Sequence, residues 1–428
     1  MKIPWMGSLL VVSGLIVGSA SAQEQFSFPT APSPYGTALV TSGAAASGEG
    51  TTAPSANAAA PGQPVASVPS INGCGGECRR NSNCSSNLYG SFEFLWLAFK
   101  KQSVPALVTQ GDPADTPTGA LGQPGTTVLF GNQDFGQSSF GGCRFTVGYW
   151  LDQDRSWGVE TSWLFVEQRK SFFSATSSGD PGTGALAVPF FNNDGGFEDA
   201  NQVALENVSA GGIAVRLTQR AWGAELNLRR PCSSCDQSLR WTLLAGFRFL
   251  DLDESLDLQT TAVALPADIG ILSAVAESHQ CINHFYGGQI GAQADYCCRD
   301  WLLTVLAKVA LGSNNERLNI NGATLNIDPI NGTVVAPGGI FTGPNNMGSH
   351  SHEQFAVVPE LGVSVGRRLS DNLTVSVGYT FLYISDVIRP GNQIDRVVNF
   401  QSNDRPAVLF KNTDFWMQGV SLGIRWNF

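Results

Sequence analysis

The feature that most constrains the fold is an alternation of side chains at a period of two, the pattern of a β-strand with two unlike faces. At the end of the chain, one face carries apolar side chains and one glutamine: Trp416, Gln418, Val420, Leu422, Ile424, Trp426 and Phe428. The other face carries Met417, Gly419, Ser421, Gly423, Arg425 and Asn427. The alternation recurs in ten segments: Leu88–Phe99, Gly141–Leu151, Trp157–Val166, Gly212–Leu228, Leu239–Leu250, Ile282–Tyr296, Trp301–Gly312, Phe355–Arg367, Leu373–Ile384 and Trp416–Phe428.

Short and long connections alternate between these segments. The short connections are LDQDRS, RRPCSSCDQ, CCRD and RLSDN, and the other five are much longer. Alternating short periplasmic turns and long outer loops are typical of transmembrane barrels, whose strands need about 9–11 residues to cross the bilayer. We therefore predict an all-β fold, an antiparallel up-and-down transmembrane β-barrel of about ten strands, or twelve if the long loops conceal further strands. The fifth and seventh strands are expected to continue above the membrane through LDLDESLDL and ERLNINGATLNI.

The two faces of the predicted strands differ in charge. The predicted lipid face is rich in aromatic and branched residues. Arg220 does not fit this pattern, because it shares the parity of Trp222, and we place it at an outer rim or a bulge. The predicted lumen face carries eleven charges, which are Glu93, Arg144, Glu160, Glu225, Arg229, Arg240, Arg248, Asp295, Lys308, Glu360 and Arg425. A ten-stranded barrel is only slightly wider than the side-chain-filled eight-stranded case. We expect these charges to pair and to fill a narrow or closed lumen, in preference to forming a selectivity filter.

Composition agrees with this prediction. Charged residues make up only 14% of the chain, which contains 48 glycines and 10% aromatic residues. Beyond the N-terminus, no apolar run approaches the roughly 20 residues of a membrane-spanning helix. The net charge of −10 provides no basic patch, so we expect no nucleic-acid partner. A secreted soluble sandwich is the alternative fold, and exposed tryptophans at alternate positions argue against it.

The residues before the barrel divide into three segments. Residues 1–22 combine Lys2, a short apolar core and Ala20-Ser21-Ala22, which predicts a signal peptide cleaved after Ala22 and hence export to the outer membrane. Residues 23–73 are rich in Ala, Ser, Pro and Gly and are expected to be disordered. Residues 74–87 contain three cysteines and are expected to lie in the periplasm, ahead of a barrel over residues 88–428.

Neither the cysteines nor the histidines form a recognisable site. Cys232 and Cys235 lie in one predicted periplasmic turn and Cys297 and Cys298 in another, where disulfides are more plausible than redox or metal chemistry. His279 and His284 are expected at the top of the sixth strand. His350 and His352 are expected in an outer loop, beside serines and glutamates that such loops contain by default. We therefore expect no enzyme, no cofactor and no metal site, with a hydrolase as the least favoured function.

Several stretches resemble a known family. They are WGAELNLR (222–229), LLAGFRFLDL (243–252), FYGGQIGAQADY (285–296), LAKVALG (306–312), YISDVIRPGNQIDRVVN (383–399) and TDFWMQGVSLG (413–423). Their order and spacing over residues 88–428 resemble the family called putative β-barrel porin seven. This resemblance implies an outer-membrane barrel and suggests transport. The terminal aromatic residue is similar to the signal that such barrels present to their assembly machinery, and it assigns that role to Trp426 and Phe428.

The sequence leaves two functions open. The first is porin-like passage of small solutes through a narrow lumen. The second is a non-conducting structural or surface-interaction barrel that acts through its long outer loops. The expected partners are outer-membrane lipid, the barrel-assembly machinery, and small solutes or surface partners.

Overall fold

A computed structural model describes residues 87–136, 139–232, 238–402 and 404–428. The chain divides into two units, 1–35 and 36–428, and the described residues all belong to the second. The predicted signal peptide with Ala20 and Ala22, the leader over 23–73 and the cysteine segment up to Ser86 lie outside the described residues.

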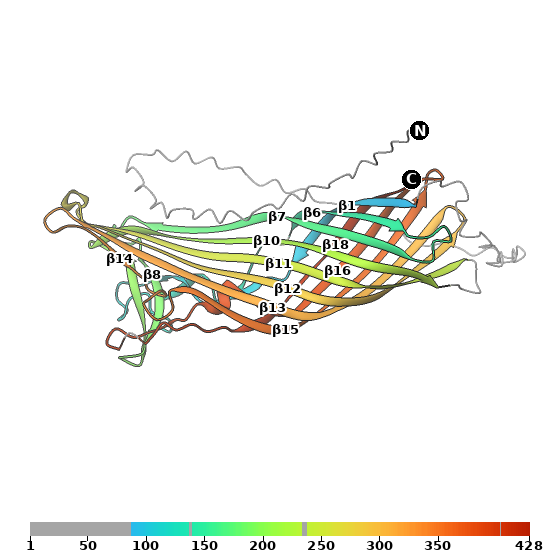
Figure 1. Cartoon of the computed structure of the whole chain (residues 1–428). Helices are drawn as coiled ribbons and strands as arrows, with labels where there is room; N and C mark the ends of the chain where they lie inside the picture. The colour runs from blue at the N-terminus through green and yellow to red at the C-terminus, as the bar shows by residue number, and fades with distance from the viewer. Residues whose placement is uncertain (1–86, 137–138, 233–237, 403) are drawn as a thin grey trace, which may run out of the picture. The chain divides into compact units, whose positions relative to one another are not determined.

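Ten antiparallel strands form a closed ring, as the alternation predicts (Figure 1). The ring strands are β1 (Leu88–Phe99), β6 (Phe140–Trp150), β7 (Gly158–Ser177), β10 (Ser209–Cys232), β11 (Leu239–Ala264), β12 (Leu272–Cys298), β13 (Trp301–Asp328), β15 (Gly348–Arg368), β16 (Leu373–Ile388) and β18 (Asn412–Asn427). Each pairs with its neighbours in sequence order, and β1 pairs with β18 to close the ring. The prediction of an up-and-down barrel of about ten strands is therefore confirmed.

The strands of one wall are much longer than a bilayer requires. Strands β10 to β13 contain 24, 26, 27 and 28 residues, whereas β1 and β6 contain 12 and 11. The predicted continuation of the fifth and seventh ring strands is confirmed by the bounds of β11 and β13. One expected long connection is wrong: β11 and β12 continue so far that only residues 265–271 join them, including the 3-10 turn η1 (Ala267–Ile269).

The long connections contain strands of their own, which do not enter the ring. Strands β3 (Val108–Gly111), β4 (Thr127–Phe130), β8 (Ala185–Asn192), β9 (Phe197–Ala204) and β17 (Val397–Val398) form one small sheet. Strand β2 (Gln102–Val104) pairs with β5 (Gln133–Phe135), and β14 (Gly332–Pro337) extends the barrel sheet beside β13. The short helix α1 (Pro390–Gln393) follows β16. We call segments 100–136, 178–208, 329–347, 389–402 and 404–411 together the cap.

The side chains that face inward form the hydrophobic core. A central apolar layer receives buried side chains from all ten ring strands, and Leu95, Phe140, Phe285, Val358 and Phe415 are representative members. A second core lies between the cap sheet and the inward face of β10 and β11, with Leu107, Val188, Val215, Leu258 and Ile394 among its members. Figure 1 shows β8 and β14 at the end of the barrel far from the C-terminus. The long-loop end is therefore packed like the interior of a soluble protein.

Among the described residues, no helix has the length and apolar character needed to cross a membrane.

Candidate functional site

The eleven charges predicted for the lumen lie on the ring strands at various depths. Arg229, Arg248, Asp295, Lys308 and Glu360 are buried, with exposed fractions of 2–7%. Glu93, Arg144, Glu160, Glu225 and Arg425 are partly buried, and Arg240 is exposed at the start of β11. The apolar residues of the opposite parity, such as Trp96, Phe145, Leu226 and Val377, are exposed where lipid surrounds the barrel.

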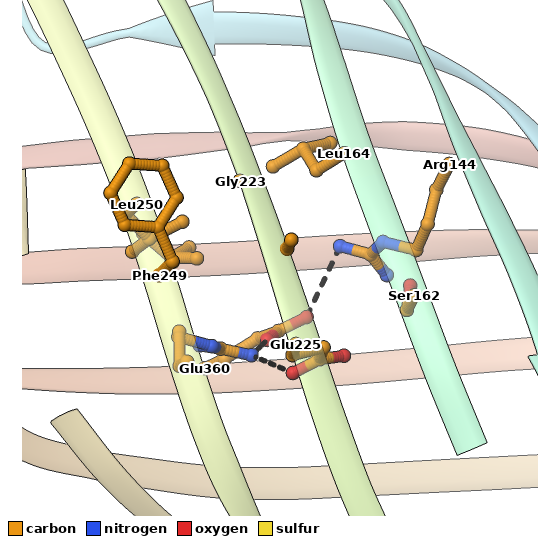
Figure 2. Close-up of a pocket in the computed structure, with 11 residues that line it drawn as sticks. Arg144, Ser162, Leu164, Gly223, Glu225, Phe249, Leu250 and Glu360 are labelled. Atoms are coloured by element: carbon orange, nitrogen blue, oxygen red, sulfur yellow. Dashed lines mark hydrogen bonds and ion pairs between the residues drawn. The ribbon is translucent and has the colours of Figure 1, made fainter. Parts of the chain in front are cut away.

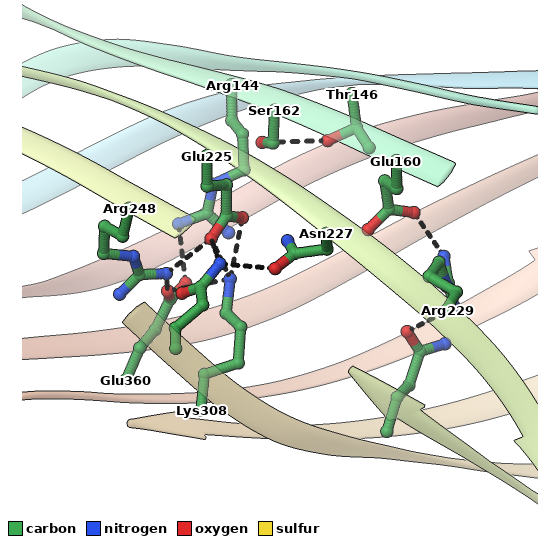
Figure 3. Close-up of polar contacts among 12 residues, drawn as sticks. Arg144, Thr146, Glu160, Ser162, Glu225, Asn227, Arg229, Arg248, Lys308 and Glu360 are labelled. Atoms are coloured by element: carbon green, nitrogen blue, oxygen red, sulfur yellow. Dashed lines mark hydrogen bonds and ion pairs between the residues drawn. The ribbon is translucent and has the colours of Figure 1, made fainter. Parts of the chain in front are cut away.

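Six of these charges form a central ion-pair cluster, made of Glu93, Arg144, Glu225, Arg248, Lys308 and Glu360. Figure 3 labels all of them except Glu93. Glu360 contacts three cations: Arg248, Lys308 at 3.0 Å and Arg144 at 3.1 Å. Glu225 binds Arg248 and Lys308, both at 2.8 Å. The cluster holds three anions and three cations, so the charges balance as buried charges normally do. Strands β1, β6, β10, β11, β13 and β15 contribute to it, so the cluster ties opposite sides of the ring together.

A second polar network lies nearer the short-turn end of the barrel. Arg229 binds Glu160 and donates to the Tyr89 hydroxyl at 3.1 Å and to Gln293 at 2.9 Å. Gln293 donates in turn to Asp295, which also accepts a hydrogen bond of 2.7 Å from Thr304. This network spans β1, β7, β10, β12 and β13, and it fills that side of the lumen.

Two cavities accompany these polar groups. The first has a volume of about 20 Å³ and lies between the ion-pair cluster and apolar side chains that include Leu164 and Leu250 (Figure 2). The second, with a volume of about 30 Å³, lies at the short-turn end and is lined by serine and threonine side chains, Glu93 and Arg425. Toward the long-loop end, the central apolar layer follows the first cavity. The lumen thus changes from polar to apolar along its length.

Above the apolar layer, Arg389 and Glu254 form a buried ion pair that sequence reasoning missed. The guanidinium donates two hydrogen bonds of 2.7 Å to the carboxylate, and the side chains are 1% and 0% exposed. Arg389 also donates to the backbone carbonyls of Lys100 and Lys101 at 2.8 and 3.0 Å. It therefore joins two cap segments to β11. In the sequence, Arg389 belongs to the stretch YISDVIRPGNQIDRVVN, which resembles the family. That resemblance gives Arg389 no structural role.

The cap is held to β12 by a second buried carboxylate. Glu277 accepts hydrogen bonds from the Phe341 amide at 2.7 Å and from the Thr342 hydroxyl at 2.9 Å. It lies well beyond Tyr286, near the outer end of β12, and so outside the membrane-spanning part of the strand. Burial raises the pKa of Glu277 to about 7, although the hydrogen bonds from the cap oppose the shift. Burial also lowers the pKa of His279, on the same face of β12, to about 4.

The other histidines are dispersed. The expectation that His350 and His352 lie in a loop is wrong, because β15 begins at Gly348 and includes both. The reason is that β15 continues beyond the membrane to pair with the extended part of β13. His352 lies 3.5 Å from Glu316, and His284 lies 3.2 Å from Asp251 on a different strand pair. Within the described residues, no group of three or more His, Cys, Asp or Glu side chains is arranged to hold a metal ion.

Cys297 and Cys298, beside the β12–β13 turn, are disulfide-bonded. Cys143, Cys232 and Cys281 are free thiols. Cys235 and the cysteines of residues 74–87 lie outside the described residues. The disulfide bonding of Cys297 and Cys298 agrees with the expectation for the short turns. Cys232, in another short turn, departs from it because its thiol is free.

Two further predictions concern individual positions. Arg220 faces outward, is 48% exposed and pairs with Asp253 at 3.0 Å, beside an irregularity in the β7–β10 register.

Trp426 lies on β18 opposite Gly90 of β1, in the strand pair that closes the barrel. Trp426 and Phe428 are 39% and 57% exposed on the outward face. Their role as an assembly signal stays a prediction.

A family model described as Putative beta barrel porin-7 (BBP7) matches residues 89–428. No curated protein matches the chain. The outer membrane protease OmpT from Escherichia coli is 10% identical over 81% of this chain and 98% of its own, with a TM-score of 0.38. A FadL homologue from Pseudomonas aeruginosa is 8% identical over 80% of this chain and 90% of its own, with a TM-score of 0.21. The toluene transporter TodX from P. putida is 9% identical over 80% of this chain and 90% of its own, with a TM-score of 0.15.

The family match confirms the resemblance that the sequence stretches indicated. It begins within β1 and continues to the last residue after β18, so it covers every strand of the ring. The chain is therefore an outer-membrane β-barrel that belongs to the family described as Putative beta barrel porin-7.

Proposed function

We propose that this protein is a non-conducting outer-membrane barrel that holds a folded cap at the cell surface, where the cap acts in surface interactions. The observation that carries this proposal is the central apolar layer, to which all ten ring strands contribute buried side chains. A hydrophilic solute that crossed this layer would lose its hydration without gaining polar partners. The layer therefore opposes passage through the middle of the lumen.

Two further barriers support the proposal. On one side of the apolar layer lies the central ion-pair cluster, in which Glu360 is 2% exposed and Arg248 is 3% exposed. On the other side lies the cap core, held by Arg389 and Glu277. Removing one partner of a buried ion pair typically costs about 3–5 kcal/mol. Opening a continuous path would break several such contacts at once.

The orientation follows from the connections. Short turns face the periplasm in barrels of this kind, so the cap lies outside the cell and both ends of the ring lie on the periplasmic side. Export by a signal peptide cleaved after Ala22 is part of this proposal.

Porin-like passage of small solutes is the alternative, suggested by the family description. It requires both the cap and the ion-pair cluster to move, because they lie in series along the lumen. The cavity beside Arg144 and Arg248 gives such a movement a place to begin, since its far wall consists of apolar side chains. The two functions therefore differ in whether the closed state opens under voltage.

Single-channel recording in planar bilayers distinguishes the two functions. The full-length exported protein is first shown to be folded and inserted, by heat-modifiable gel migration and by protease protection of the ring. We expect no reproducible conductance steps from this protein over a wide voltage range. Discrete steps whose ion selectivity changes in Arg248→Ala would contradict the proposal and support passage. Outward-facing Arg367→Ala is the matched control, because Arg367 contacts Trp301 on the lipid face.

A further inference from the structure

Two arginines face lipid at the short-turn end of the barrel. Arg230 of β10 and Arg367 of β15 are exposed on the outward face, with the same parity as Leu228 and Val365. The other outward positions that the structure describes at this end of the ring strands are uncharged. An arginine on the lipid face of a barrel is costly at the bilayer midplane and nearly free of cost close to the interface. Both side chains are therefore placed at the level of the phospholipid headgroups.

The surroundings of the two arginines are alike. In each case the arginine lies between a tryptophan next to one neighbouring strand or on it, and a branched aliphatic residue on the other neighbouring strand. The guanidinium carbons lie 4.8 and 5.7 Å from the centroids of the tryptophan rings, within the distance of about 6 Å at which a cation is attracted to a ring. The two rows are Trp157, Arg230 and Leu243, and Trp301, Arg367 and Val375.

The two guanidinium groups have hydrogen-bond donors to spare. No described residue makes an ion pair or a hydrogen bond with the guanidinium of Arg230 or Arg367. Contact with a ring leaves the planar fork of N–H donors available, and that fork matches two oxygens of a phosphate group. Outward-facing Arg220, at the long-loop end, differs because Asp253 neutralises it. The cations at the short-turn end thus lack an anion that the membrane can provide.

The next outward row toward the bilayer centre is apolar at both arginines. It provides a surface on which acyl chains can pack while a headgroup contacts the guanidinium. Neither that row nor the row of the arginine itself contains a carboxylate, so the ammonium group of a zwitterionic headgroup would find no partner. The apolar rows are Val159, Leu228 and Ala245, and Leu303, Val365 and Val377.

We propose that Arg230 and Arg367 each bind the phosphate of an anionic phospholipid, such as phosphatidylglycerol, in the periplasmic leaflet. Each guanidinium donates to two phosphate oxygens while its tryptophan holds it at headgroup level. The acyl chains of the lipid lie along the apolar row above. This inference goes beyond the proposed function and does not depend on it. Both arginines face away from the lumen, so replacing either one leaves the lumen charges unchanged.

Native mass spectrometry of the full-length exported protein in detergent micelles tests the proposal. The protein is titrated with phosphatidylglycerol or with phosphatidylcholine that has the same acyl chains. We expect two molecules of phosphatidylglycerol to bind, each with affinity about fivefold or more above that of phosphatidylcholine, as one basic side chain near an anionic lipid surface provides. Glycerol phosphate is the soluble probe of the headgroup alone. It should not displace the lipid at equal concentration, because it lacks the chains that contact the apolar row.

Three variants and a matched control sharpen the test. Arg230→Gln and Arg367→Gln should each lose one bound phosphatidylglycerol, and the double variant should lose both. Arg220→Gln removes an outward-facing arginine that is already paired, so it should retain two bound lipids. Heat-modifiable migration verifies that each variant is folded. Two bound molecules of phosphatidylglycerol in the double variant, equal affinity of the wild-type protein for the two lipids, or displacement by equimolar glycerol phosphate would overturn the lipid sites.

Discussion

Replacement of Arg389 by alanine tests whether the cap is held in place by one buried ion pair. Arg389 and Glu254 share two hydrogen bonds of 2.7 Å, and neither side chain is more than 1% exposed. The substitution leaves the Glu254 carboxylate buried without its cation, while Gln219 still donates a hydrogen bond of 2.6 Å to it. It also leaves the carbonyls of Lys100 and Lys101 without the donor that joins them to β11.

The expected cost follows from this geometry. Breaking one partner of a buried, well-formed ion pair destabilises by about 3–5 kcal/mol, because the other charge stays buried without compensation. The cap is bound mainly by its own core, so we expect it to open locally while the membrane-spanning ring stays folded. Cleavage of the transiently open cap should then become roughly 10²–10⁴ times faster, provided that opening and closing are fast relative to cleavage.

Limited trypsin digestion of the protein in lipid vesicles measures this change, because Lys101 and Arg396 lie within the cap. The matched control is Arg220→Ala, which removes an ion pair with Asp253, the residue next to Glu254. That pair is on the outward face with Arg220 48% exposed, so its loss should cost only about 0–1 kcal/mol. If Arg389→Ala digests no faster than Arg220→Ala, the pair does not hold the cap and the reasoning is refuted.

Three further predictions concern Glu277 beneath the cap, Glu360 in the ion-pair cluster and Phe428 at the end of the chain. The pKa of Glu277 in the folded protein is about 7, above the ordinary value of 4.5, so stability of the cap should fall as pH rises from about 4.5 to about 7, by about 3 kcal/mol in total. Glu277→Gln should remove this decline in trypsin resistance measured against pH, and an unchanged pH profile would contradict it. Glu360→Gln leaves three cations around a neutral group and should destabilise the barrel by about 3 kcal/mol in urea unfolding, far more than Glu167→Gln at the exposed pair with Arg169. Deletion of Phe428 should slow insertion by the assembly machinery in a reconstituted assay but leave the unfolding midpoint of inserted barrel nearly unchanged. Equal insertion rates would exclude an assembly signal at this residue.

Local pattern was sufficient for the barrel because each ring strand contacts lipid on one face and the lumen on the other. That environment imposes an alternation that can be read one strand at a time. The inward positions of Glu225, Arg248, Lys308 and Glu360 followed from parity alone. Their convergence into one cluster depended on the closed ring, which brings β10, β11, β13 and β15 to a common centre.

The cap was beyond prediction from the sequence for a physical reason. Its sheet joins β3, β8 and β17, which lie in three separate connections of the chain. The short strands have little periodicity of their own, and their partners are set by packing against the inward side of β10 and β11. The lengths of β12 and β15 were underestimated for the same reason, because outside the membrane the outward face becomes polar and the lipid-facing pattern is lost.

The sequence by itself therefore determined the class of fold, a ring of about ten strands and the side of the barrel to which each strand residue points. These properties depend on local alternation between lipid and lumen. Only the tertiary structure decided that an apolar layer fills the middle of the lumen, that Arg389 of the cap pairs with Glu254 of β11, and that Glu277 of β12 accepts hydrogen bonds from the cap. These properties depend on distances between residues far apart in the chain, which close only when the ring and the cap pack together.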